Sequence, residues 1–390
     1  MSLGVAVIGA GMAGKAHAAA YRVAPSLYRT VLPELRFVSI ADVNAELADT
    51  TGRRFGYQRH DTSWQAIAEA DDIDVVSVVI ANSLHREVVE SLLSAGKHVL
   101  CEKPLSDSLD DARAMAAAAA RAETVARIGF TYRRAPGIAA IRDWIVDGTL
   151  GRVLHFSGRY WCDYSCSPGA PMSWRYQGPM GSGALADVGS HMSYIAEFLC
   201  GDMQAVSGGA FRTVIGQRPV PLGAVVGHEH AAVSGEYRPV ENDDYATYTA
   251  HFTDCTGSVE ASRVAAGYPN GLSFEVFCEN GAASFHQDTP SQVRLYLHGD
   301  GAATNGYRTV NLGSDHPYVA GGLAMDVSGG GFGPNECFAF QARALLEEIA
   351  GIPASEALPR NASFDEGVRN MEIMAAVAES AAGNGKLVSL

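Results

Sequence analysis

Long apolar segments and closely spaced cysteines are both missing from this 390-residue sequence. No apolar run reaches the roughly 18 to 20 residues that a membrane-spanning helix needs, so we expect no membrane partner. The seven cysteines are scattered and none belongs to a Cys-x-x-Cys pair, which favours reduced thiols and a cytoplasmic location. We also expect no metal, because the spacing of Cys162, Asp163 and Cys166, and of His228 and His230, fits no zinc pattern.

Positive charge is scarce as well. The formal net charge is −14, and only four lysines accompany 25 arginines. A surface of this sign repels phosphate backbones, so nucleic acid is a poor partner and a neutral small molecule a better one. Apolar residues, in contrast, make up 47% of the sequence, and its length is more than twice that of a typical domain of roughly 150 residues. We therefore expect a globular protein with two domains.

Residues 1–130 alternate short apolar runs with helical patterns. The runs are rich in valine and isoleucine and show no alternation, which is typical of strands buried on both faces. The expected strands are 5–8, 37–41, 75–81, 98–101 and 125–129, and the expected helices are 12–23, 45–55, 63–70, 84–95 and 109–121. A Thr62/Gln65 capping box would open the third helix. This pattern predicts an α/β Rossmann domain, a doubly wound fold with a parallel sheet.

Residues 131–390 have a different pattern. Several runs alternate in hydrophobicity and Glu279-Asn280-Gly281 is a hairpin signal, so neighbouring strands should be antiparallel. Expected strands are 153–160, 245–252, 258–264, 272–278, 282–286, 293–297 and a short one within 387–390. Expected helices are 184–199, 336–349 and 365–382, the last opened by a Ser363/Glu366 capping box, and the Gly- and Pro-rich stretches 213–240 and 311–335 should be loops.

We interpret this second part as an α+β domain with a large open, mainly antiparallel sheet. It would bind the substrate and join subunits, and helix 365–382 would pack back on the first domain. A sheet with one uncovered apolar face needs burial, which predicts a homodimer or homotetramer formed through that face.

The first chemical motif directly follows the first expected strand. Gly9-Ala10-Gly11-Met12-Ala13-Gly14 has the form G-x-G-x-x-G and stands at the opening of a helix. Gly9 would provide the tight turn, Gly11 would let the backbone approach a pyrophosphate, and Gly14 would let helix and strand pack closely. In this context the motif predicts dinucleotide binding by residues 9–14.

Asp42 ends the second expected strand. A carboxylate there can accept hydrogen bonds from ribose hydroxyls and repel a 2′-phosphate, so NAD is favoured over NADP. Asp42 lies 28 residues beyond Gly14, which is longer than the usual spacing of about 20 and implies an insertion around residues 25–33. A helix cap is the alternative role for this side chain.

A lysine stands at the end of strand 98–101, in the run Glu102-Lys103-Pro104. Ligands of open α/β sheets bind at the carboxyl ends of the strands, and a lysine placed there is unfavourable unless its charge is used. The proline keeps Lys103 out of helical conformation and fixes its direction. Asn82 and His85 end another strand at the same edge and would face the same crevice, although each could simply cap a helix.

A carboxylate and an imidazole occur four residues apart in the expected helix 184–199. Asp187 and His191 would share one helix face near its amino end, where Gly181 and Gly183 allow close backbone approach. Histidine suits proton transfer near neutral pH, and a carboxylate can orient the ring and stabilise its charged form. The pair is therefore a candidate for general acid/base catalysis, with an ordinary helix-surface pair as the alternative.

Together these motifs resemble the Gfo/Idh/MocA family of NAD(P)-dependent oxidoreductases of sugars, inositols and related polyols. The resemblance covers essentially the whole chain, and its most specific piece is the Glu-Lys-Pro run. It implies Lys103, Asp187 and His191 as catalytic residues that contact the substrate. It also implies that the cofactor is bound by the glycine motif with Asp42, Asn82, His85, Glu102 and Lys103.

Some further residues are weaker candidates. Tyr132 and Arg133 match a Tyr-Arg pair that is common in the family near the nicotinamide, and Tyr132 would contact the substrate. Trp174 and Arg175 precede helix 184–199 and would border the pocket, Trp174 towards the substrate and Arg175 towards the cofactor. Asn335, beside a glycine-rich loop, is a candidate for binding substrate hydroxyls.

The expected reaction is the NAD-dependent oxidation of a secondary hydroxyl of a cyclic polyol or sugar to the ketone. The substrate would be an inositol, a monosaccharide or an anhydrosugar. One alternative is an NAD-dependent glycoside-cleaving enzyme that oxidises a ring carbon transiently. Another is a non-catalytic NAD-binding regulator, which the presence of both Lys103 and His191 disfavours.

Overall fold

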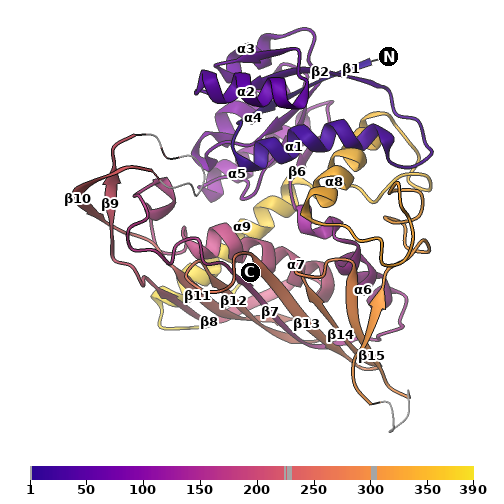
Figure 1. Ribbon diagram of the computed structural model, residues 1–390. Helices are drawn as coiled ribbons and strands as arrows, with labels where there is room; N and C mark the ends of the chain where they lie inside the picture. The colour runs from indigo at the N-terminus through magenta and orange to yellow at the C-terminus, as the bar shows by residue number, and fades with distance from the viewer. Residues whose placement is uncertain (1, 224, 226–230, 300–304) are drawn as a thin grey trace. The chain divides into compact units, whose positions relative to one another are not determined.

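The computed structural model describes residues 2–223, 225, 231–299 and 305–390 (Figure 1). His228 and His230, considered above as metal ligands, lie outside these residues. The chain forms two compact units, Met1–Ala135 with Gly313–Arg369, and Pro136–Leu312 with Asn370–Leu390. This division differs from the expected boundary at residue 130, because a later segment of the chain belongs to the first unit.

The first unit contains a parallel sheet of six strands in the order β3-β2-β1-β4-β5-β6. This order defines a doubly wound sheet whose topological switch point, where ligands of such sheets bind, lies between β1 and β4. The prediction of a parallel α/β sheet is confirmed. Strand β3 was not predicted, because it is short and polar. The strands are β1 (Ser2–Ile8), β2 (Glu34–Ala41), β3 (Arg59–Asp61), β4 (Val75–Val78), β5 (His98–Cys101) and β6 (Ala126–Ile128).

Helices α1 and α8 lie side by side in the first unit (Figure 1). Ala342, Leu345 and Leu346 of α8 belong to the same apolar core as Val5 and Val7 of β1. Residues 313–369 therefore belong to the first unit, since α8 within them supplies part of its core. The helices are α1 (Met12–Val23), α2 (Ala45–Phe55), α3 (Trp64–Glu69), α4 (His85–Ser94), α5 (Leu109–Arg121) and α8 (Pro334–Ile349).

Local sequence patterns predicted most of the helix boundaries in this unit. The predicted bounds of α1, α2 and α5 are confirmed. The Thr62/Gln65 capping box is wrong, because Ser63 caps α3 by accepting a hydrogen bond from the N–H of Ala66 at 3.3 Å. A serine side chain one residue later satisfies the same unpaired helix N–H groups.

The extra residues between α1 and β2 are held by α8. Arg343 of α8 is fully buried and donates to the carbonyl oxygens of Thr30 at 2.6 Å and Ala24 at 3.3 Å. Its Nε donates to Glu347 at 2.6 Å, so the buried charge is paired. The long spacing between Gly14 and Asp42 therefore reflects a packed loop.

The second unit contains a nine-stranded sheet in the order β16-β15-β14-β13-β7-β12-β11-β8-β17. The β13–β14 hairpin predicted at residues 279–281 is confirmed. The prediction of a mainly antiparallel sheet is confirmed, although β7 and β12 pair in parallel, as strands joined by a long connection can. The strands are β7 (Val153–Trp161), β8 (Met203–Arg212), β11 (Tyr245–Phe252), β12 (Thr256–Ser262), β13 (Gly271–Cys278), β14 (Gly281–His286), β15 (Gln292–Leu297), β16 (Arg308–Asn311) and β17 (Val388–Ser389).

Helices lie on one side of this sheet (Figure 1). They are α6 (Pro136–Val146), which the sequence analysis missed, α7 (Ser190–Cys200) and the later part of α9 (Phe364–Ala382). The predicted Ser363/Glu366 capping box of α9 is confirmed by two reciprocal hydrogen bonds. In β11, buried residues alternate with partly exposed ones, as expected for a sheet covered on one face.

Of the two segments expected to be loops, one contains strands and the other is loop over most of its length. The segment 213–240 contains a small antiparallel sheet of β9 (Gln217–Pro221) and β10 (Val233–Pro239), which its glycines and prolines concealed. The segment 311–335 lies between β16 and α8 and is loop, as predicted, over residues 312–333.

Candidate active site

The glycine motif forms the turn between β1 and α1. Gly9 has a φ of +103°, and a Cβ there would lie 2.0 Å from the carbonyl oxygen of Val79. A Cβ at Gly14 would lie 1.8 Å from the carbonyl oxygen of Gly9, whereas nothing lies within 4 Å of the Cβ position of Gly11. None of the described side chains caps the first turn of α1, which begins at Met12. Open space over Gly11 and unsatisfied helix N–H groups together fit a pyrophosphate.

Asp42 is bonded to this glycine turn. Its Oδ2 accepts a hydrogen bond from the N–H of Ala10 at 2.8 Å, and its Oδ1 accepts one from Asn44 at 2.9 Å. The alternative role of capping α2 is taken by Asn44, which accepts from the N–H of Leu47 at 3.1 Å. Each carboxylate oxygen has a second lone pair, so Asp42 retains acceptor capacity for a ribose hydroxyl.

Glu102 fixes the backbone beside Lys103 at the end of β5. Its Oε1 accepts from Nε2 of His17 at 2.9 Å and its Oε2 accepts from the N–H of Lys103 at 3.2 Å. Burial raises the pKa of Glu102, but the hydrogen bond from His17 and the charge of Lys103 outweigh burial, so the pKa lies below its ordinary value. Glu102 is therefore an ionised anchor for the lysine, while its contact with the cofactor stays a prediction.

His17 links the glycine helix to this anchor. It lies on α1, is 2% exposed, and its Nδ1 contacts Oγ of Ser77 at 3.0 Å. The hydroxyl of Tyr21 contacts the same Ser77 oxygen at 2.9 Å, and the ring of Phe338 lies edge-on to His17 at 5.2 Å. His17 was not among the residues predicted from the sequence. Its position three residues after Gly14 was visible, but its partners on β4 and β5 were not.

His85 does not face the predicted crevice. Its side chain is fully buried, with Nε2 at 3.2 Å from the carbonyl oxygen of Ile80 and Nδ1 at 3.1 Å from that of Leu105. Burial lowers the pKa of His85. In this structure His85 therefore ties the segment after β4 to the loop after β5, which corrects the expectation of an open position. Asn82 begins a short 3₁₀ turn and is partly exposed.

Tyr132 and Asn335 also belong to the first unit. Tyr132 lies in a 3₁₀ turn, Thr131–Arg134, that follows β6, and its neighbour Arg133 forms an ion pair with Glu366. Asn335 is exposed in the first turn of α8. Their predicted contacts with the substrate stay predictions.

Asp187 lies in a π-helical turn, Leu185–Gly189, that runs directly into α7. The expected regular helix 184–199 thus begins with a wider turn, a feature common at functional sites. The Oδ2 of Asp187 accepts from the hydroxyl of Tyr164 at 2.5 Å. Burial, followed by the charge of Asp187, raises the pKa of Tyr164 well above its ordinary value, so this tyrosine remains a donor. No sequence pattern indicated Tyr164, which lies 23 residues earlier in the chain.

His191 is the second residue of α7 and is also held by tyrosines. Its Nδ1 contacts the hydroxyl of Tyr194 at 2.9 Å, and its ring lies 5.6 Å from that of Tyr160. Both tyrosines are buried. The i,i+3 spacing of His191 and Tyr194 was a signal that the sequence analysis passed over. One continuous helical segment thus carries a carboxylate and an imidazole, each bonded to a tyrosine hydroxyl.

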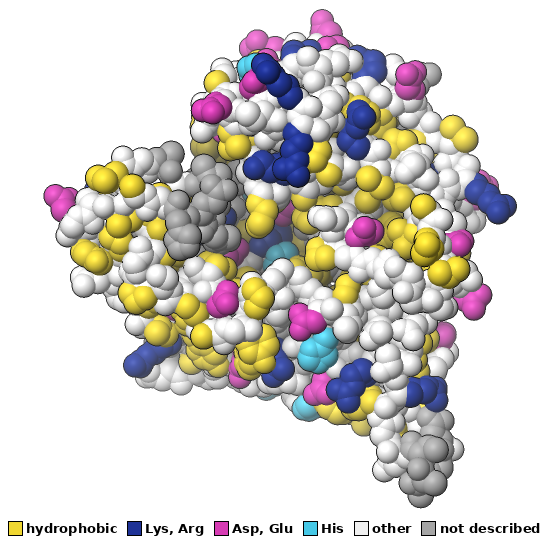
Figure 2. Space-filling model, viewed as in Figure 1, with side chains coloured by type: hydrophobic (Ala, Val, Ile, Leu, Met, Phe, Trp, Pro, Cys, Tyr) yellow, Lys and Arg dark blue, Asp and Glu magenta, His cyan; other side chains and the backbone are white. Residues whose placement is uncertain are grey.

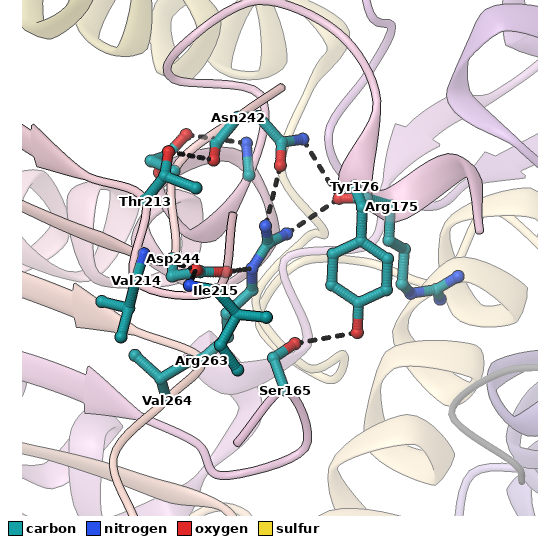
Figure 3. Close-up of polar contacts among 12 residues, drawn as sticks. Ser165, Arg175, Tyr176, Thr213, Val214, Ile215, Asn242, Asp244, Arg263 and Val264 are labelled. Atoms are coloured by element: carbon teal, nitrogen blue, oxygen red, sulfur yellow. Dashed lines mark hydrogen bonds and ion pairs between the residues drawn. The ribbon is translucent and has the colours of Figure 1, made fainter. Parts of the chain in front are cut away.

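Trp174 and Arg175 begin a 3₁₀ turn, Trp174–Tyr176. The indole is 52% exposed and the guanidinium of Arg175 lies 4.3 Å from its ring centroid. The carbonyl oxygen of Arg175 accepts from Asn242 at 3.1 Å and Arg263 at 2.8 Å, while its side chain extends away from them (Figure 3). An exposed indole on a fixed backbone is suited to stacking on a sugar ring.

The described residues contain no group of three or more His, Cys, Asp or Glu side chains placed to hold a metal ion. Within the same parts of the chain, no helix combines the length and apolar character needed to cross a membrane. Figure 2 shows acidic side chains scattered over the visible face and no continuous band of basic ones.

A doubly wound sheet with open space over Gly11, and with Asp42 bonded to the same turn, is built to bind a dinucleotide. Lys103, Asp187 and His191 are of the types that stabilise negative charge and transfer protons when an alcohol loses a hydride. These features define the class of nicotinamide-dependent oxidoreductases. Residues 3–130 match the model described as "Oxidoreductase family, NAD-binding Rossmann fold", and residues 138–284 match the "GFO/IDH/MocA C-terminal domain". The chain belongs to the Gfo/Idh/MocA family of NAD-dependent oxidoreductases.

Named relatives and solved structures agree with this family. Levoglucosan dehydrogenase of Pseudarthrobacter phenanthrenivorans is 35% identical, with 98% of this chain and 96% of the relative aligned. D-glucoside 3-dehydrogenase of Escherichia coli is 30% identical over 51% of this chain and 54% of the relative. The structure of a levoglucosan dehydrogenase in complex with NADH and levoglucosan superposes with a TM-score of 0.89 at 33% identity, covering 100% of this chain and 99% of the other.

Proposed function

We propose that this protein oxidises a secondary hydroxyl of a sugar with NAD, and that levoglucosan, an anhydrosugar, is its first candidate substrate. The observation that carries this proposal is the full-length similarity to a levoglucosan dehydrogenase, 35% identical over 98% of this chain. The tyrosine-held Asp187 and His191 support it, because oxidation of a hydroxyl needs a group that accepts its proton.

We assign one role in the reaction to each of the three proposed catalytic side chains. Tyr194 engages Nδ1 of His191, so we assign Nε2 to the proton of the substrate hydroxyl. Lys103 carries the positive charge that stabilises the developing alkoxide. Asp187, with Tyr164 as its donor, supplies a negative charge that favours the protonated imidazole. When bound, NAD supplies the hydride acceptor.

A substrate panel tests the proposal. Purified protein is assayed with NAD and separately with NADP against levoglucosan, glucose, a methyl glucoside and myo-inositol, by following NADH or NADPH absorbance. We expect kcat/KM for levoglucosan to exceed the others by about tenfold or more, as pocket contacts typically discriminate. NAD should be preferred, because Asp42 lies beside the glycine turn and repels a 2′-phosphate.

Other outcomes of the panel contradict the proposal in different ways. Cleavage of the methyl glucoside without net NADH release would indicate the glycoside-cleaving alternative. NADH binding without turnover of any sugar would indicate a regulator. Preference for NADP would overturn the role given to Asp42.

We also propose a cytoplasmic homodimer or homotetramer joined through the second sheet. The face opposite α6 and α7 carries the partly exposed residues Thr247, Thr249 and His251 of β11, so it is more polar than the apolar face expected from the sequence, and the proposed contact would be a polar one. The seven cysteines are free thiols in the structure, which supports the proposed reducing compartment. Sedimentation that shows a monomer at every concentration would contradict the assembly.

A further inference from the structure

Three consecutive polar residues, Asn242, Asp243 and Asp244, are fully buried in the second unit between β10 and β11. Burying such groups is unfavourable unless their hydrogen bonds are satisfied. Asn242 donates to the carbonyl oxygens of Arg175 and Gln177, each at 3.1 Å. Figure 3 shows Asn242 and Asp244 converging on one guanidinium, that of Arg263. This segment therefore holds other parts of the unit in place.

Asp243 binds the turn that leads into the π-helical turn carrying Asp187. Its oxygens accept from four backbone N–H groups: Oδ1 from Gly181 at 2.8 Å and Gly183 at 2.9 Å, Oδ2 from Leu185 at 2.9 Å, and the carbonyl oxygen from Ala184 at 2.9 Å. The N–H of Asp187 then donates to the carbonyl oxygen of Gly183 at 2.9 Å. A short series of backbone hydrogen bonds thus connects Asp243 with the proposed catalytic carboxylate.

Packing reinforces this contact at Gly183. A Cβ at this position would lie 2.1 Å from the carbonyl oxygen of Asp243 and 2.9 Å from its nitrogen, distances that no side chain tolerates. Gly181 has a φ of +96°, a conformation that other residues rarely adopt. The sequence indicated that another part of the backbone comes close to Gly181 and Gly183. In the structure, that part is Asp243.

A carboxylate suits this position better than an amide does. It accepts at both oxygens, and its charge interacts favourably with the N–H groups at the start of a helical segment. An asparagine of the same shape would turn an NH₂ group towards at least one of these N–H donors. The turn would then have to shift until its buried donors found other partners.

We propose that Asp243 is a positioning residue for the reaction. By fixing residues 181–185, it sets the position of Asp187 and, further along the same helical segment, of His191. The inference rests on the proposed function, because that function defines what these two residues do. Asp243 itself would touch neither the substrate nor the cofactor.

Asp244 provides a matched control. It is as buried as Asp243, and its carboxylate, like that of Asp243, accepts three hydrogen bonds (Figure 3). They come from Nε of Arg263 at 2.8 Å and from the N–H groups of Val214 at 2.8 Å and Ile215 at 2.9 Å. These donors lie outside the turn 181–185. Asp244→Asn also breaks a buried ion pair with Arg263, so a general loss of buried interactions should affect it at least as strongly as Asp243→Asn. A positioning role instead predicts the larger kinetic effect for Asp243→Asn.

The test compares Asp243→Asn with Asp244→Asn in the full-length chain, using the most active sugar of the panel. Asp243→Asn should lower kcat by about 10- to 100-fold, since a misplacement of about 1 Å has effects of this size. Its primary deuterium isotope effect on kcat should rise towards the full value for hydride transfer, and its Kd for NADH should not change. For Asp244→Asn, kcat should stay within about threefold of the wild-type value and the isotope effect should not change. Both variants are measured at a temperature where they are shown to be folded.

Gly183→Ala is a second variant that leaves every polar group in place and pushes the turn away from Asp243. We expect the same kinetic pattern as for Asp243→Asn. Equal kcat values for the two aspartate variants, or an unchanged isotope effect in Asp243→Asn, would overturn the proposal. So would failure of both Asp243→Asn and Gly183→Ala to fold, because the segment would then act on stability alone. Absence of sugar-dependent NADH formation by the wild-type protein contradicts the proposed function instead.

Discussion

Lys103→Met is expected to lower kcat for the sugar by about 10²- to 10³-fold, the typical effect of removing one group that stabilises a developing oxyanion. The substitution keeps much of the length of the side chain and removes its positive charge and its hydrogen-bond donors. The Kd for NADH, measured by fluorescence titration, should change by no more than about threefold, because the space over Gly11 and the carboxylate of Asp42 do not depend on this side chain. Steady-state kinetics at saturating NAD measure the effect.

Lys386→Met is the control for this prediction. Lys386 is exposed and pairs with Glu379 at 2.8 Å, and such surface pairs contribute little to stability. Its kcat should equal that of the wild-type protein. Turnover of Lys103→Met within about threefold of the wild-type value would show that the ammonium at the end of β5 takes no part in the chemical step.

His191→Asn should lower kcat by about 10²- to 10⁴-fold, the usual contribution of a general base. Asparagine can keep a polar contact to the hydroxyl of Tyr194 but cannot take a proton. Tyr194→Phe retains the imidazole and removes only the hydroxyl that holds its Nδ1, so a smaller loss of about three- to tenfold is expected. The two variants therefore separate the proton acceptor from the group that orients it.

His155→Asn is the matched histidine control. His155 lies exposed on β7, and its ring contacts Phe277. We expect its kcat and KM to match those of the wild-type protein. If His191→Asn retained wild-type turnover and Lys103→Met did not, proton transfer would have to be reassigned to another group of the site.

The sequence predicted those parts of the fold that depend on neighbouring residues. The strand–turn–helix at Gly9 to Gly14 could be predicted because its features lie within six consecutive residues: Gly9 has a positive φ, Gly14 packs directly against Gly9, and Gly11 leaves open space over the turn. The Ser363/Glu366 box and the hairpin at residues 279–281 were readable for the same reason. The parallel pairing of β7 with β12 could not be predicted, because it joins segments about a hundred residues apart. Their local patterns carry no information about the relative direction of the two strands.

In the candidate site, too, contacts between residues far apart in the sequence could not be predicted. Lys103, Asp187 and His191 could be selected from residue type and spacing. Their partners could not, since Tyr164 and Asp243 reach Asp187 and its turn from 23 and about 60 residues away. The sequence could indicate which groups are suited to the chemistry, and only the structure shows what holds them.

The packing of α8 against α1 has a consequence for the order in which the protein can be completed during synthesis. Helix α1 shares its core with Ala342, Leu345 and Leu346, which are made more than 300 residues after it. A nascent chain that ends near residue 135 therefore still exposes apolar surface that only the last part of the chain covers. Synthesis of the cofactor-binding unit therefore starts before residues 136–312 of the second unit are made and ends after them.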